Sequence, residues 1–252
     1  MRGTFTGVGT GPGDPSLMTL KAVEVIRTSG VLALPVSDPG LEEPVLASDR
    51  EERYLENCTA WQIALGAVPE AEDKRKLLLP MPMLKDRKRL DEIHDRDADA
   101  VASFLEQGVD VAFLTLGDPT VYSTCMYLHQ RLKSRGYPTA VVPGITSFTA
   151  AAARMDMPLV QNREELHVLP ASYEISESLG LPGTKVLMKA GRKLQEVKQA
   201  ILAEGMEAVM VENCGMEGEH IYSCAEAIPE QAGYYSLLVI REKKEKQRRE
   251  EQ

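Results

Sequence analysis

The chain has 252 residues, of which 43% are hydrophobic and 27% are charged. This length and composition are ordinary for a globular protein with one large or two modest hydrophobic cores. The net charge of -9 disfavours a general nucleic-acid-binding protein, because such proteins usually carry a basic surface. No apolar run approaches the ~20 residues that span a bilayer, and no signal-peptide pattern is present. We therefore expect a cytoplasmic protein that binds neither nucleic acid nor a membrane.

The cysteines and histidines show no pattern of a structural site. The four cysteines lie far apart and form no C-x-x-C pair. The four histidines have no neighbour at metal-ligand spacing. We expect neither a disulfide framework nor a bound metal.

Apolar and β-branched runs alternate with helical patterns along the chain, which predicts an α/β architecture with largely parallel strands in the first half. A stretch from residue 37 to residue 83 is rich in loops and contains a short helix near 58–65. The charged end, 242–252, is expected to be a solvated tail. Strands are predicted at 4–8, 31–36, 109–116, 139–142, 185–189, 208–212 and 234–241, and the other helices at 15–28, 90–107, 121–135, 147–155 and 193–204.

The helix predicted at 15–28 has clear start signals. Asp14 is a good N-cap, and Pro15 suits the first helical position. Its apolar residues recur at three-residue spacing, which is close enough to the helical period to predict one buried face. These residues are Leu17, Leu20, Val23 and Ile26.

Three glycine-containing turns each follow a predicted strand. They are GVGTGPGD at 7–14, LGDP at 116–119 and PGITS at 143–147. In open α/β sheets, ligands bind beyond the carboxyl ends of the strands, where such turns gather. The turns therefore predict a ligand site, although tight connections between strand and helix explain the glycines equally well.

The first turn does not fit a dinucleotide or a phosphate. The spacing G-x-G-x-x-G fails from either starting glycine, because the third position falls on Pro12 or on Asp14. A phosphate also needs free N–H groups at a positive helix terminus, which Asp14 occupies. A nucleoside without phosphate, such as S-adenosylmethionine, fits better, because glycine turns allow close approach and carboxylates tolerate its positive charges.

Taken in this order, the three turns resemble those of the tetrapyrrole (corrin/porphyrin) methylase family. The family signatures are similar to the first turn with LMTLKA at 17–22, to GDPTVY at 117–122 and to PGITS at 143–147. A strand ending in Met188 and the strand YSLLVI at 235–240 complete the set, so the resemblance covers residues 3–241. It is closest to the carbon-20 methyltransferases of cobalamin biosynthesis, through MPM at 81–83 and the segment 117–132, with an additional proline in the stretch 81–89.

The resemblance implies two αβα domains of the class III methyltransferase type, at 1–118 and 119–241, with S-adenosylmethionine in the cleft between them. It implies a homodimer that methylates carbon-20 of a tetrapyrrole, either precorrin-2 or cobalt-factor II. Tyr122 is the candidate catalytic residue, as a polar group near the ring. The implied cofactor contacts are Pro12, Leu116, Gly117, Asp118, Val121, Thr146, Ser147, Met188 and Cys214.

Because this substrate is rich in carboxylates, an acidic protein must gather cations where the substrate binds. Any one of the candidate cations is also explained as part of a solvated face. The candidates are Arg154, Arg163, Lys189, Arg192 and the run from Lys85 to Arg89.

Two other functions stay open. One is another methyltransferase of the same superfamily, acting on a different corrin ring carbon, as a diphthine synthase or on ribosomal RNA. The other is a tetrapyrrole-binding protein without catalytic activity.

Overall fold

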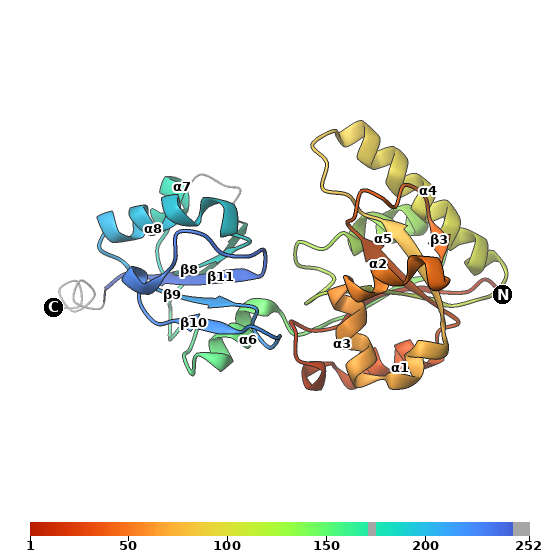
Figure 1. Ribbon diagram of the computed structural model, residues 1–252, viewed down its shortest axis with the longest axis horizontal. Coiled ribbons are helices and arrows are strands. Elements are labelled where there is room, and N and C mark those ends of the chain that lie inside the picture. Colours follow the sequence, from red (N-terminus) through yellow and green to blue (C-terminus); the bar gives the residue numbers. More distant parts are fainter. Residues whose placement is uncertain (171–174, 244–252) are drawn as a thin grey trace. The chain divides into compact units, whose positions relative to one another are not determined.

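The computed structural model describes residues 1–170 and 175–243 (Figure 1). The chain forms two compact units, Met1–Thr146 and a second that begins at Ser147. Each unit contains one sheet with helices packed on it, which confirms the predicted α/β class. The expected boundary lies between residues 118 and 119, and the structure places it after Thr146. The helix Cys125–Ser134 and the strand Thr139–Val142 belong to the first unit. The expected tail lies, from residue 244 on, outside the described residues.

The sheet of the first unit has the strand order β3-β4-β2-β5-β1-β6. All neighbouring strands are parallel except the short edge pair of β3 and β4. The carboxyl ends of β1, β2, β4, β5 and β6 therefore meet at one edge of the sheet. The strands are β1 (Phe5–Gly9), β2 (Val31–Val36), β3 (Val45–Leu46), β4 (Arg75–Pro80), β5 (Val111–Thr115) and β6 (Thr139–Val142).

Helices cover both faces of this sheet, because successive side chains of a strand point to opposite faces. On one face, Leu32 and Leu114 pack with Ile26 and Trp61 of the helices below. On the other face, Phe113 packs with residues of α4 and α5 (Figure 1). Continuous apolar runs such as β2 and β5 are thus buried on both sides. The helices are α1 (Leu20–Thr28), α2 (Glu52–Glu56), α3 (Thr59–Ala67), α4 (Arg87–Glu106) and α5 (Cys125–Ser134).

The helix predicted at 15–28 is interrupted. A 3-10 turn at Pro15–Leu17 comes first, capped by Asp14, and α1 begins only at Leu20, with Thr19 as its N-cap. The predicted apolar stripe is confirmed for Val23 and Ile26, which pack in the core, and is wrong for Leu20 at the start of the helix. Leu20 is 89% exposed, whereas Ile26 is fully buried.

The second unit has a five-stranded sheet in the order β10-β9-β11-β8-β7, parallel only between β7 and β8. Helices α7 and α8 pack on one face of this sheet, and α6 packs on the other. The elements are α6 (Ser147–Arg154), β7 (Leu166–Pro170), α7 (Ile175–Leu179), β8 (Thr184–Met188), α8 (Leu194–Ala203), β9 (Glu207–Glu212), β10 (His220–Tyr222) and β11 (Ser236–Arg241).

Within the described parts of the chain, no helix combines the length and apolar character needed to cross a membrane. All four cysteines are free thiols. Burial raises the pKa of Cys58 to about 11 and that of Cys125 to about 12, so neither thiol is ionised at neutral pH.

Candidate functional site

The three glycine turns meet at one edge of the first sheet. Strand β1 pairs in parallel with both β5 and β6, so the turns that follow these strands leave the sheet together. The N–H of Gly117 donates to the carbonyl of Gly11 at 2.7 Å, and the N–H of Gly11 donates to the carbonyl of Gly117 at 3.3 Å. The structure thus brings together the turns that the sequence predicted as a site.

Glycine is required where the turns touch. A Cβ atom on Gly144 would lie 2.1 Å from the carbonyl oxygen of Gly117, and one on Gly9 would lie 2.5 Å from the same oxygen. These overlaps involve backbone atoms, so no side-chain rotation relieves them. Gly117 has a φ of +70°, in the left-handed region that favours glycine. An added Cβ at Gly117 would meet nothing within 4 Å, so open space adjoins this turn.

Asp118 joins the second turn to the third. Its Oδ2 accepts a hydrogen bond from the N–H of Gly144 at 2.9 Å. Its Oδ1 accepts from the N–H of Thr120 at 2.8 Å and also from the Thr120 hydroxyl. Asp118 is buried, and both of its oxygens have protein partners. Its side chain therefore shapes the site by holding two turns in place.

Replacement of Asp118 by alanine is expected to lower the free energy of unfolding by about 2–3 kcal/mol, because the N–H groups of Gly144 and Thr120 lose a buried, charged acceptor. Urea unfolding measures the change. The matched control is Asp38→Ala, because Asp38 accepts a similar bond from the N–H of Gly40 in an exposed turn. The control should lose less than about 1 kcal/mol. Equal losses in the two variants would contradict the clamping role of Asp118.

The first turn carries a negative charge at its end. Hydrogen bonds from Ser16 hold the pKa of Asp14 below its ordinary value. The carboxylate is therefore ionised at neutral pH, which disfavours a phosphate beside it. Pro12, a predicted contact, is buried in the same turn, and Leu116 in the second turn is partly buried.

Tyr122 lies in the second turn with an unusual backbone conformation. Its φ is +49°, which is rare and strained for a bulky side chain, and its side chain is half exposed. The adjacent Ser123 hydroxyl is 2.8 Å from that of Thr115 and accepts from the N–H of Cys125. These contacts hold the residues directly after Tyr122 against the end of β5. Backbone strain of this kind clusters at functional sites.

The predicted residues of the second unit share one face of its sheet. Met188 ends β8 and Cys214 follows β9, and both pack against the cluster beneath α6, the helix that begins at Ser147. Leu237 of β11 pairs with both Met188 and Val211, which places the ends of β8 and β9 on either side of it. The structure thus brings Met188 and Cys214 to one cluster of the second unit, whereas Ser147 is the first residue of the helix that covers it.

The remaining predicted contacts lie where the turns continue. Val121 is partly buried after the Gly-Asp-Pro turn, and Thr146 is the last residue of the first unit. Among the candidate cations, the Nε of Arg154 donates to Glu219 at 2.6 Å, and the Nζ of Lys189 lies 5.4 Å from the centre of the Tyr234 ring. The side chain of Arg192 is outside the part of the chain that the structure describes.

A mostly parallel sheet with glycine turns at its carboxyl edge, followed by a mostly antiparallel second sheet, defines a two-domain α/β protein with a candidate ligand site at the first sheet. The family model of the tetrapyrrole (corrin/porphyrin) methylases matches residues 4–228, and the chain belongs to this family.

Relatives agree with this assignment, and a solved structure shares the fold. A precorrin-2 C(20)-methyltransferase of Sinorhizobium sp is 32% identical over 249 residues, which cover 94% of this chain and 95% of the relative. A cobalt-precorrin-2 C(20)-methyltransferase of Salmonella typhimurium is 28% identical and is covered to 97%, with 95% of this chain matched. The uroporphyrin-III C-methyltransferase of Thermus thermophilus, crystallised with S-adenyl homocysteine, has a TM-score of 0.63 and 20% identity, with 95% of this chain and 98% of that chain covered. At that identity, the solved structure bears on the fold alone.

Proposed function

We propose that this chain transfers a methyl group from S-adenosylmethionine to carbon-20 of precorrin-2 or cobalt-factor II, in cobalamin biosynthesis. The observation that carries the proposal is the match over 94% of the chain to a methyltransferase of this specificity. The glycine turns support it, because they are the family's signature segments and meet at one edge of the first sheet.

S-adenosylmethionine fits these turns chemically. When bound, it supplies an electrophilic methyl group on a positively charged sulfur. The ionised Asp14 tolerates a cation and opposes a phosphate. The open space beside Gly117 lets a ligand approach the backbone closely. The proposed contacts are Pro12, Leu116, Gly117, Asp118, Val121 and Thr146 in the first unit and Ser147, Met188 and Cys214 in the second.

The chain's main contribution to the reaction is to hold the two reactants in position and to exclude water. The methyl acceptor is an electron-rich ring carbon, so its activation requires little acid–base chemistry. The Asp118 bond to Gly144 keeps two of the binding turns fixed, which reduces the reorganisation needed on binding. Tyr122, held in its strained conformation, is the proposed polar group beside the tetrapyrrole.

Removal of the Tyr122 hydroxyl in Tyr122→Phe is expected to lower kcat about 3- to 10-fold, as for the loss of one hydrogen bond. The affinity for S-adenosylhomocysteine should not change. Steady-state kinetics and calorimetry measure the two quantities. Tyr127→Phe is the control, because Tyr127 is also half exposed and stacks on His94 of α4. An unchanged kcat in Tyr122→Phe would remove this tyrosine from the mechanism.

The deciding experiment incubates the protein with S-adenosylmethionine and either precorrin-2 or cobalt-factor II. A mass gain of one methyl group, located at carbon-20 by NMR, is the expected result. Methylation at another ring carbon would identify a different member of the family. Calorimetry with S-adenosylhomocysteine tests the cofactor separately. The absence of both a binding heat and a thermal shift would contradict a methyltransferase.

The free thiols support a location in the cytoplasm, where thiols stay reduced. The resemblance also supports a homodimer. Sedimentation at twice the chain mass of 27.8 kDa is the expected result for the dimer.

A further inference from the structure

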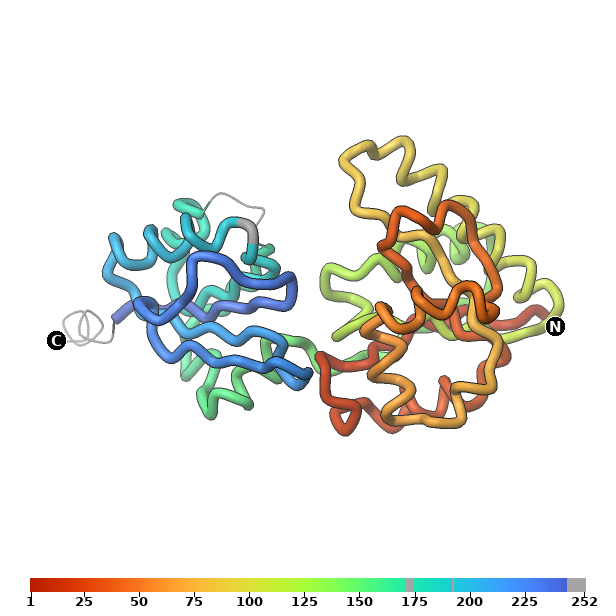
Figure 2. The backbone as a smooth tube through the Cα atoms, viewed as in Figure 1, coloured from red at the N-terminus to blue at the C-terminus, as the bar shows by residue number. Residues whose placement is uncertain are grey.

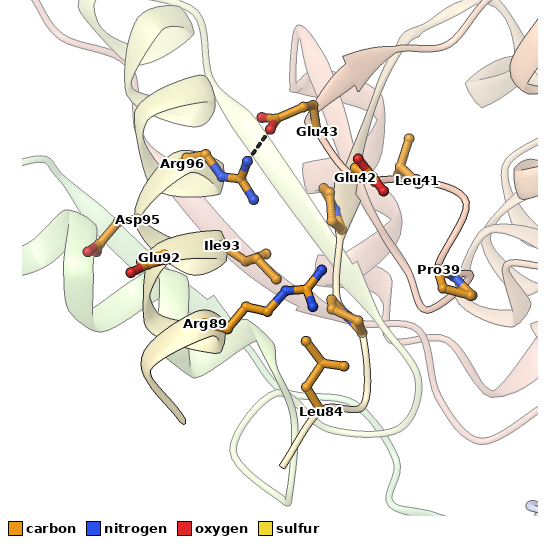
Figure 3. A pocket seen from close by; sticks show the side chains of 12 residues that line it. Pro39, Leu41, Glu42, Glu43, Leu84, Arg89, Glu92, Ile93, Asp95 and Arg96 are labelled. Carbon is orange, nitrogen blue, oxygen red and sulfur yellow. Dashed lines mark hydrogen bonds and ion pairs between the residues drawn. The ribbon is translucent and has the colours of Figure 1, made fainter. Parts of the chain in front are cut away.

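A pocket of about 630 Å³ lies in the first unit, beyond the carboxyl ends of β2 and β4 (Figure 3). Its walls are the loop at 39–43, the segment at 80–84 and the first turns of α4. Figure 2 shows these two loops and the start of α4 on the same side of the first unit. None of the predicted cofactor contacts lines this pocket.

One cation in the pocket is unpaired among the described residues. The guanidinium of Arg89 extends into the pocket (Figure 3) and makes no hydrogen bond or ion pair with the side chains that the structure describes. Arg96, about two helical turns further along α4, pairs with Glu43. Asp95 points to the other side of α4, where it accepts from the Nε of Arg131 at 2.9 Å. The positive charge left for a ligand is therefore that of Arg89.

The rest of the pocket is lined by apolar side chains and by charged ones, of which Glu92 lies beside Asp95, away from Arg89. Pro80 and Pro82 line one wall, and Leu84 and the buried Ile93 lie close to Arg89. Glu42 faces the pocket from the opposite loop. An apolar wall with one arginine suits a hydrophobic ring edge that carries one carboxylate, and Glu42 disfavours a second carboxylate nearby.

The pocket opens at the same edge of the sheet as the glycine turns. Strand β2 pairs in parallel with β5, and β4 pairs in parallel with β2. Because neighbouring strands lie about 4.8 Å apart, β2 and β4 are about 5 and 10 Å from the strand that leads into the Gly117 turn. A ligand as wide as a tetrapyrrole can reach from the turns to the pocket.

We propose that this pocket holds one carboxylate side chain of the tetrapyrrole substrate, with Arg89 as its hydrogen-bonding partner. Two parallel N–H bonds from the guanidinium to a carboxylate fix direction as well as distance. The subsite thus sets the rotational position of the macrocycle and thereby selects which ring carbon faces the methyl donor. This proposal rests on the proposed methyltransferase function.

The test compares Arg89→Ala with Lys88→Ala, which removes a neighbouring exposed cation of the same helical turn that does not line the pocket. Arg89→Ala is expected to raise KM for the tetrapyrrole about 10- to 100-fold, as for the loss of a charge-assisted pair. The affinity for S-adenosylhomocysteine should stay unchanged. Arg89→Lys should restore part of the lost affinity, and the salt dependence of KM should fall in Arg89→Ala.

The outcomes separate this subsite from the function. Methylation by the wild type, with equal KM for Arg89→Ala and Lys88→Ala, would overturn the subsite and leave the function standing. Loss of S-adenosylhomocysteine affinity in parallel with the rise in KM would also overturn it. Fluorescence titration with the tetrapyrrole gives a second readout that does not depend on turnover. A wild type that neither binds nor methylates the tetrapyrrole would overturn both proposals.

Discussion

Gly144→Ala is expected to abolish measurable binding of S-adenosylhomocysteine and to lower the free energy of unfolding by about 3 kcal/mol or more. The new methyl group would lie 2.1 Å from the carbonyl oxygen of Gly117 and 2.9 Å from the Cα of Gly9. Both neighbours are backbone atoms in turns that leave adjacent strands. The turns must therefore separate, and the hydrogen bond from the Gly144 N–H to Asp118 is lost with them.

Calorimetry and urea unfolding measure the two effects of this substitution. The control is Gly180→Ala, where the added methyl group would lie 3.5 Å from the nearest atom, the carbonyl oxygen of Ser176. That distance is an ordinary van der Waals contact, so the control should bind the cofactor normally. Normal affinity in Gly144→Ala would show that the contact of the turns is not required for binding.

Asp97→Asn is expected to make the protein more stable at pH 8, with a gain that disappears as the pH falls toward 4. Asp97 lies on the buried side of α4 with no exposed surface, and neither of its carboxylate oxygens has a hydrogen-bond partner among the described residues. Burial raises its pKa from 3.8 to about 8. The folded state therefore binds a proton that the unfolded state has already released.

The sign of the pH dependence follows from this difference. The contribution of Asp97 to the free energy of unfolding is largest below pH 3.8 and is lost as the pH rises to about 8. Between these two pKa values, the contribution of Asp97 to the free energy of unfolding falls by up to about 1.4 kcal/mol per pH unit. The amide of Asp97→Asn cannot ionise, so its unfolding free energy should fall less steeply than that of the wild type between pH 5 and pH 8.

Urea unfolding at several pH values gives both slopes. Asp99→Asn is the matched control, because Asp99 lies on the exposed side of α4 and pairs with Arg135 at 2.6 Å. This control should change the unfolding free energy by less than about 1 kcal/mol. Identical slopes for the wild type and Asp97→Asn would show that Asp97 is ionised in the folded protein at neutral pH.

The strands bounded by clear turn signals were predictable from sequence. Strands β2 and β6 have the predicted bounds, because each is an apolar run between a helix end and a glycine- or proline-containing turn. Strand β4 was missed, because its apolar run ends in Pro80 and continues into a second proline, which is typical of a loop. In the sheet, Pro80 pairs with Val36 at the very end of the strand, where a missing N–H costs little.

The gathering of the three turns was predictable, but their contacts were not. Glycine at 9, 117 and 144 indicated freedom of the backbone, whereas the overlap that requires it involves segments far apart in sequence. The resemblance implied that Asp118 contacts the cofactor, and the structure adds that its two oxygens are already engaged by Gly144 and Thr120. The positive φ of Tyr122 has no sequence signal, because tyrosine rarely adopts it.

The position of β1 in the sheet has a consequence for synthesis of the chain. This strand is made first, yet both of its partners, β5 and β6, come at the end of the first unit. Thr10, at its end, bonds to Thr115, which is 105 residues away. Strand β1 therefore has both edges unpaired while the ribosome produces most of the unit. Such edges invite association with other chains, and a truncated chain that stops before β6 lacks a complete binding site.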